Sequence, residues 1–593
     1  MTIRDTASER VTAEVEPTRA HTASASASTT PDAAEHSARD GDTWPSTRAL
    51  WWAVGGLLLS RVVYHIAYIM FDPFARVTFS DGELYERAAR DVLAHPFWGS
   101  QPLYLQGLYA YLLAAGIGPT GSVVGGLILQ LIAAGAGLLA FGAAARSCFG
   151  PRSGLLSLIA LLAVFDLAFY ENKYLSVSLG ISACMFVVWA AVRAAARPSL
   201  ARMATWGACL GVAVLGRGNL LLALPGCVLG AWLVSRGRAV AQPRPLDAGV
   251  RNVLALLFGC ALALLPMALR NSHVTGELSV FPSHAGGIPF YIGNNPHANG
   301  RWNTAGGLLT GQVANERHEL VRRLGLDAQS PHLDAAIGAE LYRRAFTFIR
   351  AEPVRWLGLE AEKLWDTLGN HAFVRDYDRL GERELLGLAQ PVGLPFGVLL
   401  GLGVLGLGAL LSEARADPAR AAVSCTLVSL LGACLAANLV WFTSAQNRAP
   451  LIVPLAFAAG PAITALLQHL RGHAPLQRSP ALLWLAALSA VQAFYPRIAE
   501  QQHPSSTHYY NLANVEEELG QSGAALAHYA RASELSPRQP MFWWRRAYLA
   551  QRLQRWDEAR LALEHLTVLP DLPPELARAA QSVRAKLPTT EPQ

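Results

Sequence analysis

The sequence predicts an all-α, polytopic membrane protein with about eleven transmembrane helices, followed by an external segment of helical repeats. Three observations support this. Of its 593 residues, 52% are hydrophobic and only 16% are charged, whereas about a quarter of the residues are charged in soluble proteins. Many apolar runs approach or exceed the length that crosses a bilayer. The end of the chain repeats with a period of about 34 residues, typical of paired helices.

Arginine position orients the predicted spans. The only lysines are Lys173, Lys363 and Lys586, and the net charge of +6 comes from arginines scattered between apolar runs. This pattern indicates membrane topology and not a nucleic-acid surface. Five arginine clusters break the apolar runs, and the positive-inside rule makes all five cytoplasmic, with the N-terminus inside and the C-terminus outside. The predicted spans are 49–71, 121–145, 153–170, 174–192, 203–216, 219–235, 252–269, 391–411, 421–442, 449–470 and 480–494.

Three regions follow from this topology. The segment 1–47 is rich in Ser, Thr and Ala and predicts a disordered cytoplasmic tail. The membrane domain covers 48–496 and carries two external loops, 72–120 and 271–390. In the first loop, 102–118 is apolar, but if it crossed the membrane, the next arginine cluster would lie outside. An interfacial helix is therefore expected. The seven cysteines lie in or beside apolar runs, which favours packing over disulfides or metal binding.

The region 504–590 predicts tetratricopeptide repeats. Two units are too few for a free-standing solenoid, so the repeats are expected to lean on the membrane domain or to bind a protein partner. The first unit is marked by Leu512, Ala513, Gly520, Ala525, Tyr529, Ala532 and Pro537, and the second by Ala547, Trp556, Ala559, Leu563 and Pro570.

An acidic pair follows the first span. Asp81 and Tyr85 are four residues apart and share one face of a predicted helix at the outer membrane surface. A structural explanation is equally open. Ser80 with Glu83 forms a capping-box pattern, and acids are favoured in a first helical turn by the helix dipole.

A second acid, Glu171, ends the third predicted span, with Asp166 about one turn deeper. Carboxylates near a bilayer are costly and tend to face a cavity or a partner, so Glu171 is a candidate catalytic residue. The alternative is a local pair with Lys173. In the first span, Arg61 and His65 are one turn apart, and either a cavity or a polar interhelical contact explains them.

Three arginines lie at outer span ends, where the positive-inside rule disfavours them: Arg217, Arg270 and Arg448. Guanidinium groups suit phosphate, so a phospholipid-like ligand at the outer leaflet is one explanation. Snorkelling to headgroups is the other. In the large loop, Asn294 and Asn295 precede a proline, and their amides could bind sugar hydroxyls or simply form a turn.

Taken together, these motifs resemble the GT-C superfamily of membrane glycosyltransferases, in particular the bacterial branch near the protein O-mannosyltransferases and the lipid A aminoarabinose transferase. The resemblance runs from about residue 48 to 470, and the order of the motifs along the chain is its most specific feature. It is carried by Asp81 and Tyr85, Pro102-Leu103-Tyr104, Glu171, Arg217-Gly218-Asn219, Gly293-Asn294-Asn295-Pro296, Glu352-Pro353-Val354-Arg355-Trp356 leading to Lys363, and Arg448-Ala449-Pro450.

The resemblance implies an inverting transferase in the bacterial inner membrane, with Asp81 as the catalytic base. It implies a sugar donor on polyprenyl phosphate, an acceptor that is protein, lipid or glycan, and repeats that engage acceptors. The expected substrate-binding residues are Glu83, Tyr85, Tyr104, Arg217, Arg270, Asn294, Asn295 and Arg448. Relatives often have adjacent Asp-Glu, whereas Gly82 separates Asp81 from Glu83 here. Where the aminoarabinose transferase has Glu-Lys before its proline, this chain has Ser100-Gln101. No cofactor is therefore assigned, although an Asp-x-Glu pair could hold a divalent ion.

Other functions stay open. A polysaccharide polymerase or O-antigen ligase would use arginines and a histidine of the late loop and would not need Asp81. A transporter would place acids at mid-span, where Asp166 is the only deep one. A non-catalytic scaffold would bind partners through the repeats. No phosphate-binding GxxxxGK[ST] loop, dinucleotide fingerprint, HExxH or GxSxG motif is present.

Overall fold

The computed structural model describes residues 45–236, 245–282, 286–309, 313–329, 333–369, 376–472, 483–489, 504–570 and 572–588. By its contacts the chain divides into residues 1–46 and 47–593, and the fold described below belongs to the second unit. The predicted tail therefore lies almost wholly outside the described residues. The eleventh predicted span is described only over 483–489, which are helical.

The described residues form helices and no strands, which confirms the all-α polytopic prediction. Within the described residues, eight helical segments are long and apolar enough to cross a membrane. They are α2 (Thr47–Phe71), α5 (Val123–Leu162), α7 (Ser176–Ala196), η2 with α9 (Gly218–Arg236), Ala248–Thr275 of α10 (Pro245–Thr275), α16 (Phe396–Glu413), α17 (Pro418–Val440), and Ala445–Leu470, which comprises α18, η4 and α19.

Three predicted spans correspond to interrupted or short helices. The predicted spans 121–145 and 153–170 lie on the two sides of Gly150 in α5, where the helix is interrupted with a φ of 81° and Pro151 follows, so the structure has the break predicted between them. The remainder of the second is α6 (Phe165–Glu171). The predicted span 203–216 is α8 (Leu200–Gly216), an apolar helix shorter than the others. The segment predicted to be interfacial forms α4 (Gly107–Thr120), a helix of 14 residues.

The spans pack closely because small residues face one another. Gly207 of α8 lies against the main chain of Leu256 in α10, and Gly406 of α16 lies against Ala458 of α19; a Cβ at either glycine would fall within 2 Å of a carbonyl oxygen. Such small-residue contacts are the usual basis of helix association in membranes. Helix α7 is the most buried span and packs on α5, α8 and α17. The seven cysteines are all free.

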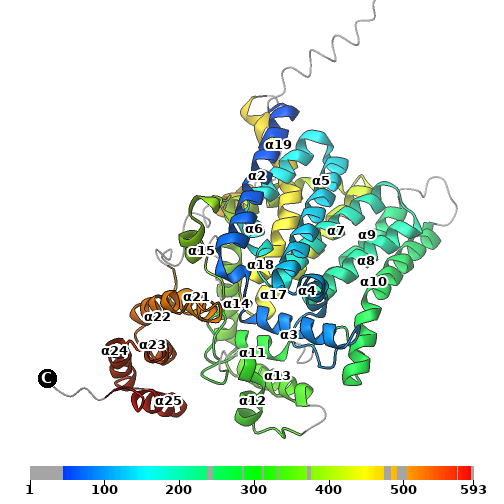
Figure 1. The fold of residues 1–593 in the computed structure, drawn as a ribbon. Helices are drawn as coiled ribbons and strands as arrows, with labels where there is room; N and C mark the ends of the chain where they lie inside the picture. The colour runs from blue at the N-terminus through cyan, green and yellow to red at the C-terminus, as the bar shows by residue number, and fades with distance from the viewer. Residues whose placement is uncertain are drawn as a thin grey trace, which may run out of the picture. The chain divides into compact units, whose positions relative to one another are not determined.

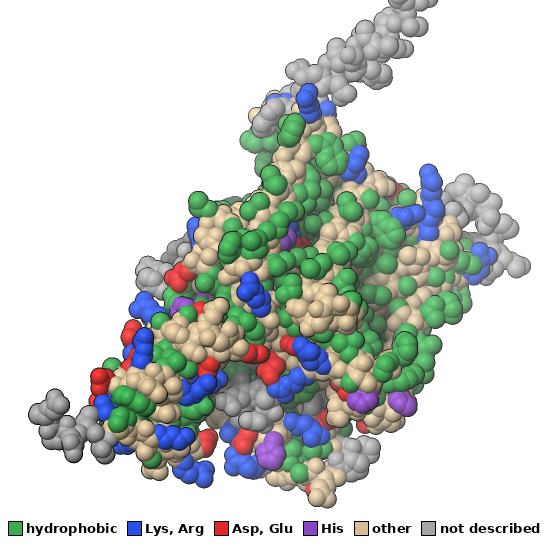
Figure 2. Space-filling model, in the orientation of Figure 1, with side chains coloured by type: hydrophobic (Ala, Val, Ile, Leu, Met, Phe, Trp, Pro, Cys, Tyr) green, Lys and Arg blue, Asp and Glu red, His purple; other side chains and the backbone are tan. Residues whose placement is uncertain are grey.

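The outward faces of several spans stay apolar. On α2, Leu59, Ile66 and Met70 are exposed, and Phe258 is exposed on α10. Figure 2 shows hydrophobic side chains over the long helices and charged side chains gathered toward the end where the shorter helices lie. This distribution suits a chain whose long helices face lipid.

The two long loops between spans build helices at one end of the bundle, except for α15 (Arg379–Leu386), which lies beside α2 (Figure 1). The first loop contributes α3 (Asp81–Ala94) and α4. The large loop contributes α11 (Gly287–Gly293), α12 (Val313–Leu324), α13 (Leu333–Ala351), α14 (Pro353–Leu368), α15 and η3 (Gly387–Ala389). Apart from α15, both loops predicted to be external therefore lie on the same side of the bundle.

Five further helices follow the spans: α21 (Ser506–Glu518), α22 (Ser522–Leu535), α23 (Pro540–Arg552), α24 (Trp556–Thr567) and α25 (Pro574–Arg584). They are called the repeat helices below. Helices α21 and α23 begin 34 residues apart, at Ser506 and Pro540, and helices α22 and α24 also begin 34 residues apart, at Ser522 and Trp556. This spacing is the period predicted for the repeats. Ala513, Ala525 and Tyr529 are fully buried among them. Helix α21 also contacts η1 (Pro73–Ala75), just after the first span.

Candidate active site

Asp81 begins helix α3 directly after a tight turn. The N–H of Gly82 donates to the carbonyl oxygen of Phe79 at 3.0 Å, which closes a four-residue turn. Its first central residue, Ser80, has φ 53° and ψ −128°, a conformation of the mirror-image type II′ turn that favours glycine. A non-glycine residue in such a strained conformation is held by its surroundings and is frequent at functional sites.

The capping box expected from Ser80 and Glu83 does not form. The Ser80 side chain makes no capping hydrogen bond to α3; its hydroxyl donates instead to Oδ1 of Asp376 in the large loop, at 2.8 Å. The Glu83 carboxylate forms an exposed ion pair with Arg87. The capping box therefore does not explain these acids, and the helix dipole is the structural explanation that still applies to Asp81.

Two cavities meet at Asp81. The smaller cavity, of about 670 Å³, lies between α3, α8, α17 and the start of α11. The larger cavity, of about 1370 Å³, lies between α3, the 442–447 loop and the repeat helices. Four residues line both cavities: Asp81, Phe442, Gln446 and Asn447. A carboxylate at such a junction can contact two different ligands at once.

The smaller cavity brings together four of the predicted site residues: Asp81, Tyr85, Tyr104 and Arg217. Its other walls are largely apolar and include Leu215, Leu222, Ile288 and Val440. The Tyr85 hydroxyl donates to Oε1 of Gln106 at 2.8 Å, and burial raises the pKa of Tyr85, so the phenol stays protonated.

Arg217 is the cation of the smaller cavity. It lies between α8 and η2 and donates to Oδ1 of Asn447, a residue of the junction. Its side-chain stem passes over Gly180, where a Cβ would approach Arg217 to 2.8 Å. An arginine held beside an apolar space is suited to a ligand with a phosphate head and a hydrocarbon tail.

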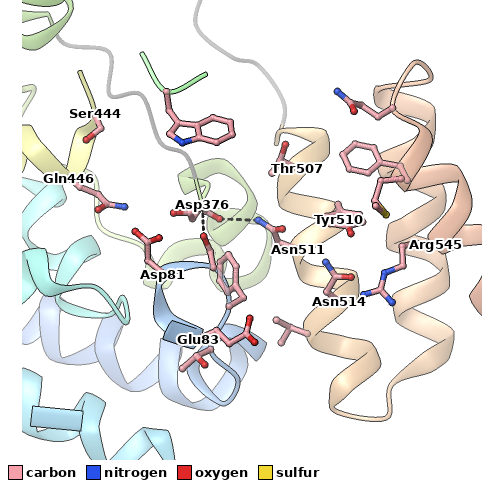
Figure 3. Close-up of a pocket in the computed structure, with 18 of the residues that line it drawn as sticks. Asp81, Glu83, Asp376, Ser444, Gln446, Thr507, Tyr510, Asn511, Asn514 and Arg545 are labelled. Atoms are coloured by element: carbon pink, nitrogen blue, oxygen red, sulfur yellow. Dashed lines mark hydrogen bonds between the residues drawn. The ribbon is translucent and has the colours of Figure 1, made fainter. Parts of the chain in front are cut away.

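The larger cavity is lined by polar and aromatic side chains from the repeat helices (Figure 3). Tyr510, Asn511 and Asn514 project from α21, and Arg545 from α23. Figure 3 shows Asp81 and Gln446 on one side and these residues on the other, with Asp376 between them. This wall offers hydrogen-bond donors and acceptors for a polar ligand.

Four other predicted site residues contact other parts of the protein: Arg448 and Arg270, and the asparagines Asn294 and Asn295. Arg448 is buried, donates to the carbonyl oxygen of Gly369 at 2.6 Å and pairs with Asp166 at 3.3 Å. Arg379 also pairs with Asp166. Arg270 is buried and donates to the carbonyl oxygens of Trp98 and Gln101 at 2.8 and 2.5 Å, in the loop before α4. Neither Arg448 nor Arg270 is among the residues that line the two cavities.

The amides of Asn294 and Asn295 are turned into the protein. Asn294 donates to the carbonyl oxygens of Phe290 and Val440, both at 2.9 Å, and accepts from Lys363 at 3.3 Å. Asn295 donates to the carbonyl oxygen of Tyr291 at 2.8 Å and is fully buried. Of the two explanations from the sequence, these contacts favour the structural turn over sugar binding.

Glu171 forms a buried cluster with the first span. Its carboxylate pairs with Arg61 and lies 3.2 Å from Nε2 of His65, and it is only 2% exposed. Its partner is therefore Arg61 and not Lys173, which pairs with Glu382. Glu171 is not among the residues that line either cavity, so its catalytic role stays a prediction.

Substitutions can distinguish a structural role of Glu171, in its buried ion pair, from a catalytic one. Glu171→Ala leaves the Arg61 guanidinium buried without this partner, so we expect it to lower the free energy of unfolding by about 3–5 kcal/mol. The double variant Arg61→Met, Glu171→Leu removes both charges and should recover most of that loss. Thermal unfolding in detergent measures both effects. A double variant that is stable but inactive in sugar transfer would instead support catalysis by Glu171.

A divalent ion does not fit the predicted acidic pair. In the ranges that the structure describes, no three His, Cys, Asp or Glu side chains are grouped to hold a metal. The Glu83 carboxylate is paired with Arg87 and is half exposed, so Asp81 and Glu83 do not form a shared oxygen-ligand set. We expect treatment with EDTA to change the rate of sugar transfer by less than about twofold. A loss that Mg²⁺ or Mn²⁺ restores would contradict this.

The sequence reasoning missed several residues of the site. Gln446 and Asn447 stand directly before Arg448. Their amides are visible in the sequence, but the predicted site includes only the arginine. Asp376 lies in a stretch of the large loop where acids alternate with arginines and which carries no motif of its own. Asn511 and Asn514 flank Leu512 and Ala513 of the first repeat, and their spacing of three residues, which puts both amides on one helical face, is the available sign.

Comparison with known proteins adds structural likeness only. No protein-family model and no curated protein sequence matches the chain. Similar solved structures include the archaeal oligosaccharyltransferase AglB from Archaeoglobus fulgidus in complex with an inhibitory peptide and a dolichol-phosphate. It is 15% identical, with a TM-score of 0.39, and the match covers 90% of this chain and 61% of AglB. The chain thus spans less than two thirds of that enzyme's length.

Two further structures are similar. The apo form of the Archaeoglobus fulgidus oligosaccharyltransferase is 13% identical, with a TM-score of 0.41 and coverage of 88% of this chain and 60% of that one. ArnT from Cupriavidus metallidurans, bound to undecaprenyl phosphate, is 15% identical, with a TM-score of 0.32 and coverage of 80% and 89%. AglB and ArnT are GT-C glycosyltransferases, the superfamily that the sequence motifs resemble. TM-scores below 0.5 are too low for these likenesses to assign a function to this chain.

Proposed function

We propose that this protein is a membrane glycosyltransferase that moves a sugar from a polyprenyl-phosphate donor to an acceptor hydroxyl, with Asp81 as the general base. The observation that supports it is the position of Asp81 at the junction of two unlike cavities. The smaller cavity is apolar and holds Arg217, which suits the donor's phosphate and hydrocarbon tail. The larger cavity is polar and suits the acceptor.

In this mechanism the acceptor hydroxyl enters from the larger cavity and transfers its proton to the Asp81 carboxylate. The acceptor oxygen attacks the anomeric carbon, and the bond from that carbon to the phosphate oxygen breaks in the same displacement, so the configuration inverts. The leaving lipid phosphate is already charged and needs stabilisation instead of a proton. Arg217 is placed to stabilise it, whereas Arg270 and Arg448, both predicted for this task, are engaged elsewhere.

The orientation belongs to the same proposal. The arginine clusters favour an N-terminus in the cytoplasm, and the proposal is that the site and the repeats lie outside the inner membrane of a bacterium. A sugar on lipid phosphate carries its own activating group, so transfer there needs no nucleotide. Membrane lipids surround the spans, and a nucleic-acid partner is not proposed.

The test is a deletion strain. Without the protein, a polyprenyl-phosphate-linked sugar should accumulate in the lipid extract, and one class of cell-envelope glycan should lose the same sugar mass. Mass spectrometry of both fractions, with complementation by the full chain, measures this. Accumulation of an undecorated polymer precursor would favour the polymerase or O-antigen-ligase alternative. Unchanged glycans would favour a non-catalytic repeat scaffold.

A further inference from the structure

The repeat helices are connected to the turn before Asp81 through Asp376. The Asn511 side-chain amide, on α21, donates to the carbonyl oxygen of Asp376 at 3.3 Å. The Asp376 carboxylate in turn accepts the Ser80 hydroxyl at 2.8 Å. Both contacts are drawn in Figure 3. Three segments far apart in the sequence therefore meet one residue before the candidate base.

Ser80 is the residue that this connection restrains. Its positive φ costs a non-glycine residue free energy, and such a conformation persists only where neighbouring groups hold it. The turn also has little freedom on its other side. A Cβ at Gly82 would lie 3.2 Å from Cβ of Tyr174, so the start of α3 is closely packed against the segment after α6. The direction of the Asp81 side chain thus depends on keeping the Ser80 conformation.

Helix α21 is seated firmly enough to position Asp376. The N–H of Ser505, before α21, donates to Asp378 at 2.8 Å, and the Tyr509 hydroxyl donates to Glu384 at 2.8 Å. A Cβ added at Gly381 would lie only 2.1 Å from the His508 ring, so the ring packs directly against this glycine. The first repeat helix is therefore fixed against α15 and the 376–378 segment.

We infer that Asp376 is a positioning residue for the proposed reaction, and that the first repeat helix, through Asp376, holds the strained Ser80 turn that aims Asp81 at the junction. The repeats thereby act on the candidate base itself, in addition to lining the acceptor cavity. This inference rests on the proposed role of Asp81.

The activity test uses full-length protein with membranes of the deletion strain as the source of donor and acceptor. Asp376→Ala should lower the initial rate of transfer about tenfold, because Ser80 leaves its strained conformation. The affinity for undecaprenyl phosphate, a probe of the smaller cavity, should stay within about twofold. Glycine adopts positive φ freely, so Ser80→Gly in the Asp376→Ala background should restore the rate to within about threefold of Ser80→Gly alone.

A second measurement does not depend on the reaction. Amide hydrogen exchange over residues 78–86 should accelerate in Asp376→Ala and, to a smaller degree, in Asn511→Ala, since both release the turn. Ser80→Gly should restore protection in the Asp376→Ala background. If Asp81→Asn kept full activity, the proposed function would fail while this exchange result still reported the connection.

Two outcomes would overturn the inference. One is an Asp376→Ala defect that Ser80→Gly does not rescue, which would mean that Asp376 acts by some route other than the turn. The other is unchanged exchange over 78–86 in Asn511→Ala, which would disconnect the repeat helix from the base.

Discussion

Replacing Asp81 by Asn is expected to lower the rate of sugar transfer by about 10²–10⁴-fold, the usual contribution of a general base. The amide is nearly the same size as the carboxylate and cannot take the acceptor proton, so the fold and both cavities should be kept. Initial rates with membranes of a deletion strain measure the effect, and thermal unfolding in detergent checks the fold.

The matched control is Asp557→Asn. Asp557 is fully exposed on α24 and pairs only with Arg560 among the ion pairs of the described chain, so its rate should stay within about twofold of the unchanged protein. An Asp81→Asn protein that retains a substantial fraction of the rate would remove Asp81 from catalysis and favour an enzyme that does not need it.

Replacing Arg217 by Gln is expected to lower kcat/KM for the lipid donor by about 10²–10³-fold, because a half-buried cation is lost where negative charge develops on the leaving phosphate. Arg217→Lys keeps the charge without the planar donor fork, so an intermediate loss of about tenfold is expected. Transfer rates and the affinity for undecaprenyl phosphate measure the two effects separately.

Arg343→Gln is the control for Arg217. Arg343 lies on α13, is largely exposed and pairs with Glu340, so its loss should change neither rate nor affinity beyond about twofold. If Arg217→Gln bound undecaprenyl phosphate as tightly as the unchanged protein and transferred sugar at the same rate, the smaller cavity would not be the phosphate site.

The sequence predicted site residues where a single charged side chain is energetically unfavourable in its surroundings. Asp81 and Arg217 stand out because acids and arginines beside apolar runs at the outer end of a span need a reason, and Tyr85 stands out because it shares a helical face with Asp81. Arg448 and Arg270 met the same criterion, yet one pairs with Asp166 and the other holds the loop before α4. Which arginine faces a cavity depends on how the loops fold back.

The fold was predictable to a similar extent. Apolar length and arginine position located the spans, including the break at Gly150 within α5 and the short helix α8. The repeat period located the last helices without showing what they contact. Asp376 contacts Ser80 across 296 positions of sequence, and Asn511 contacts Asp376 across 135, and no local pattern reports contacts of that range.

The most direct test of the two-cavity site is a structure of the full chain in lipid nanodiscs with undecaprenyl phosphate. The proposed function predicts a phosphate within hydrogen-bond distance of Arg217, its hydrocarbon tail in the smaller cavity, and the Asp81 carboxylate facing the phosphate across the junction. A phosphate bound at Arg448 or Arg270, with the smaller cavity empty, would contradict it.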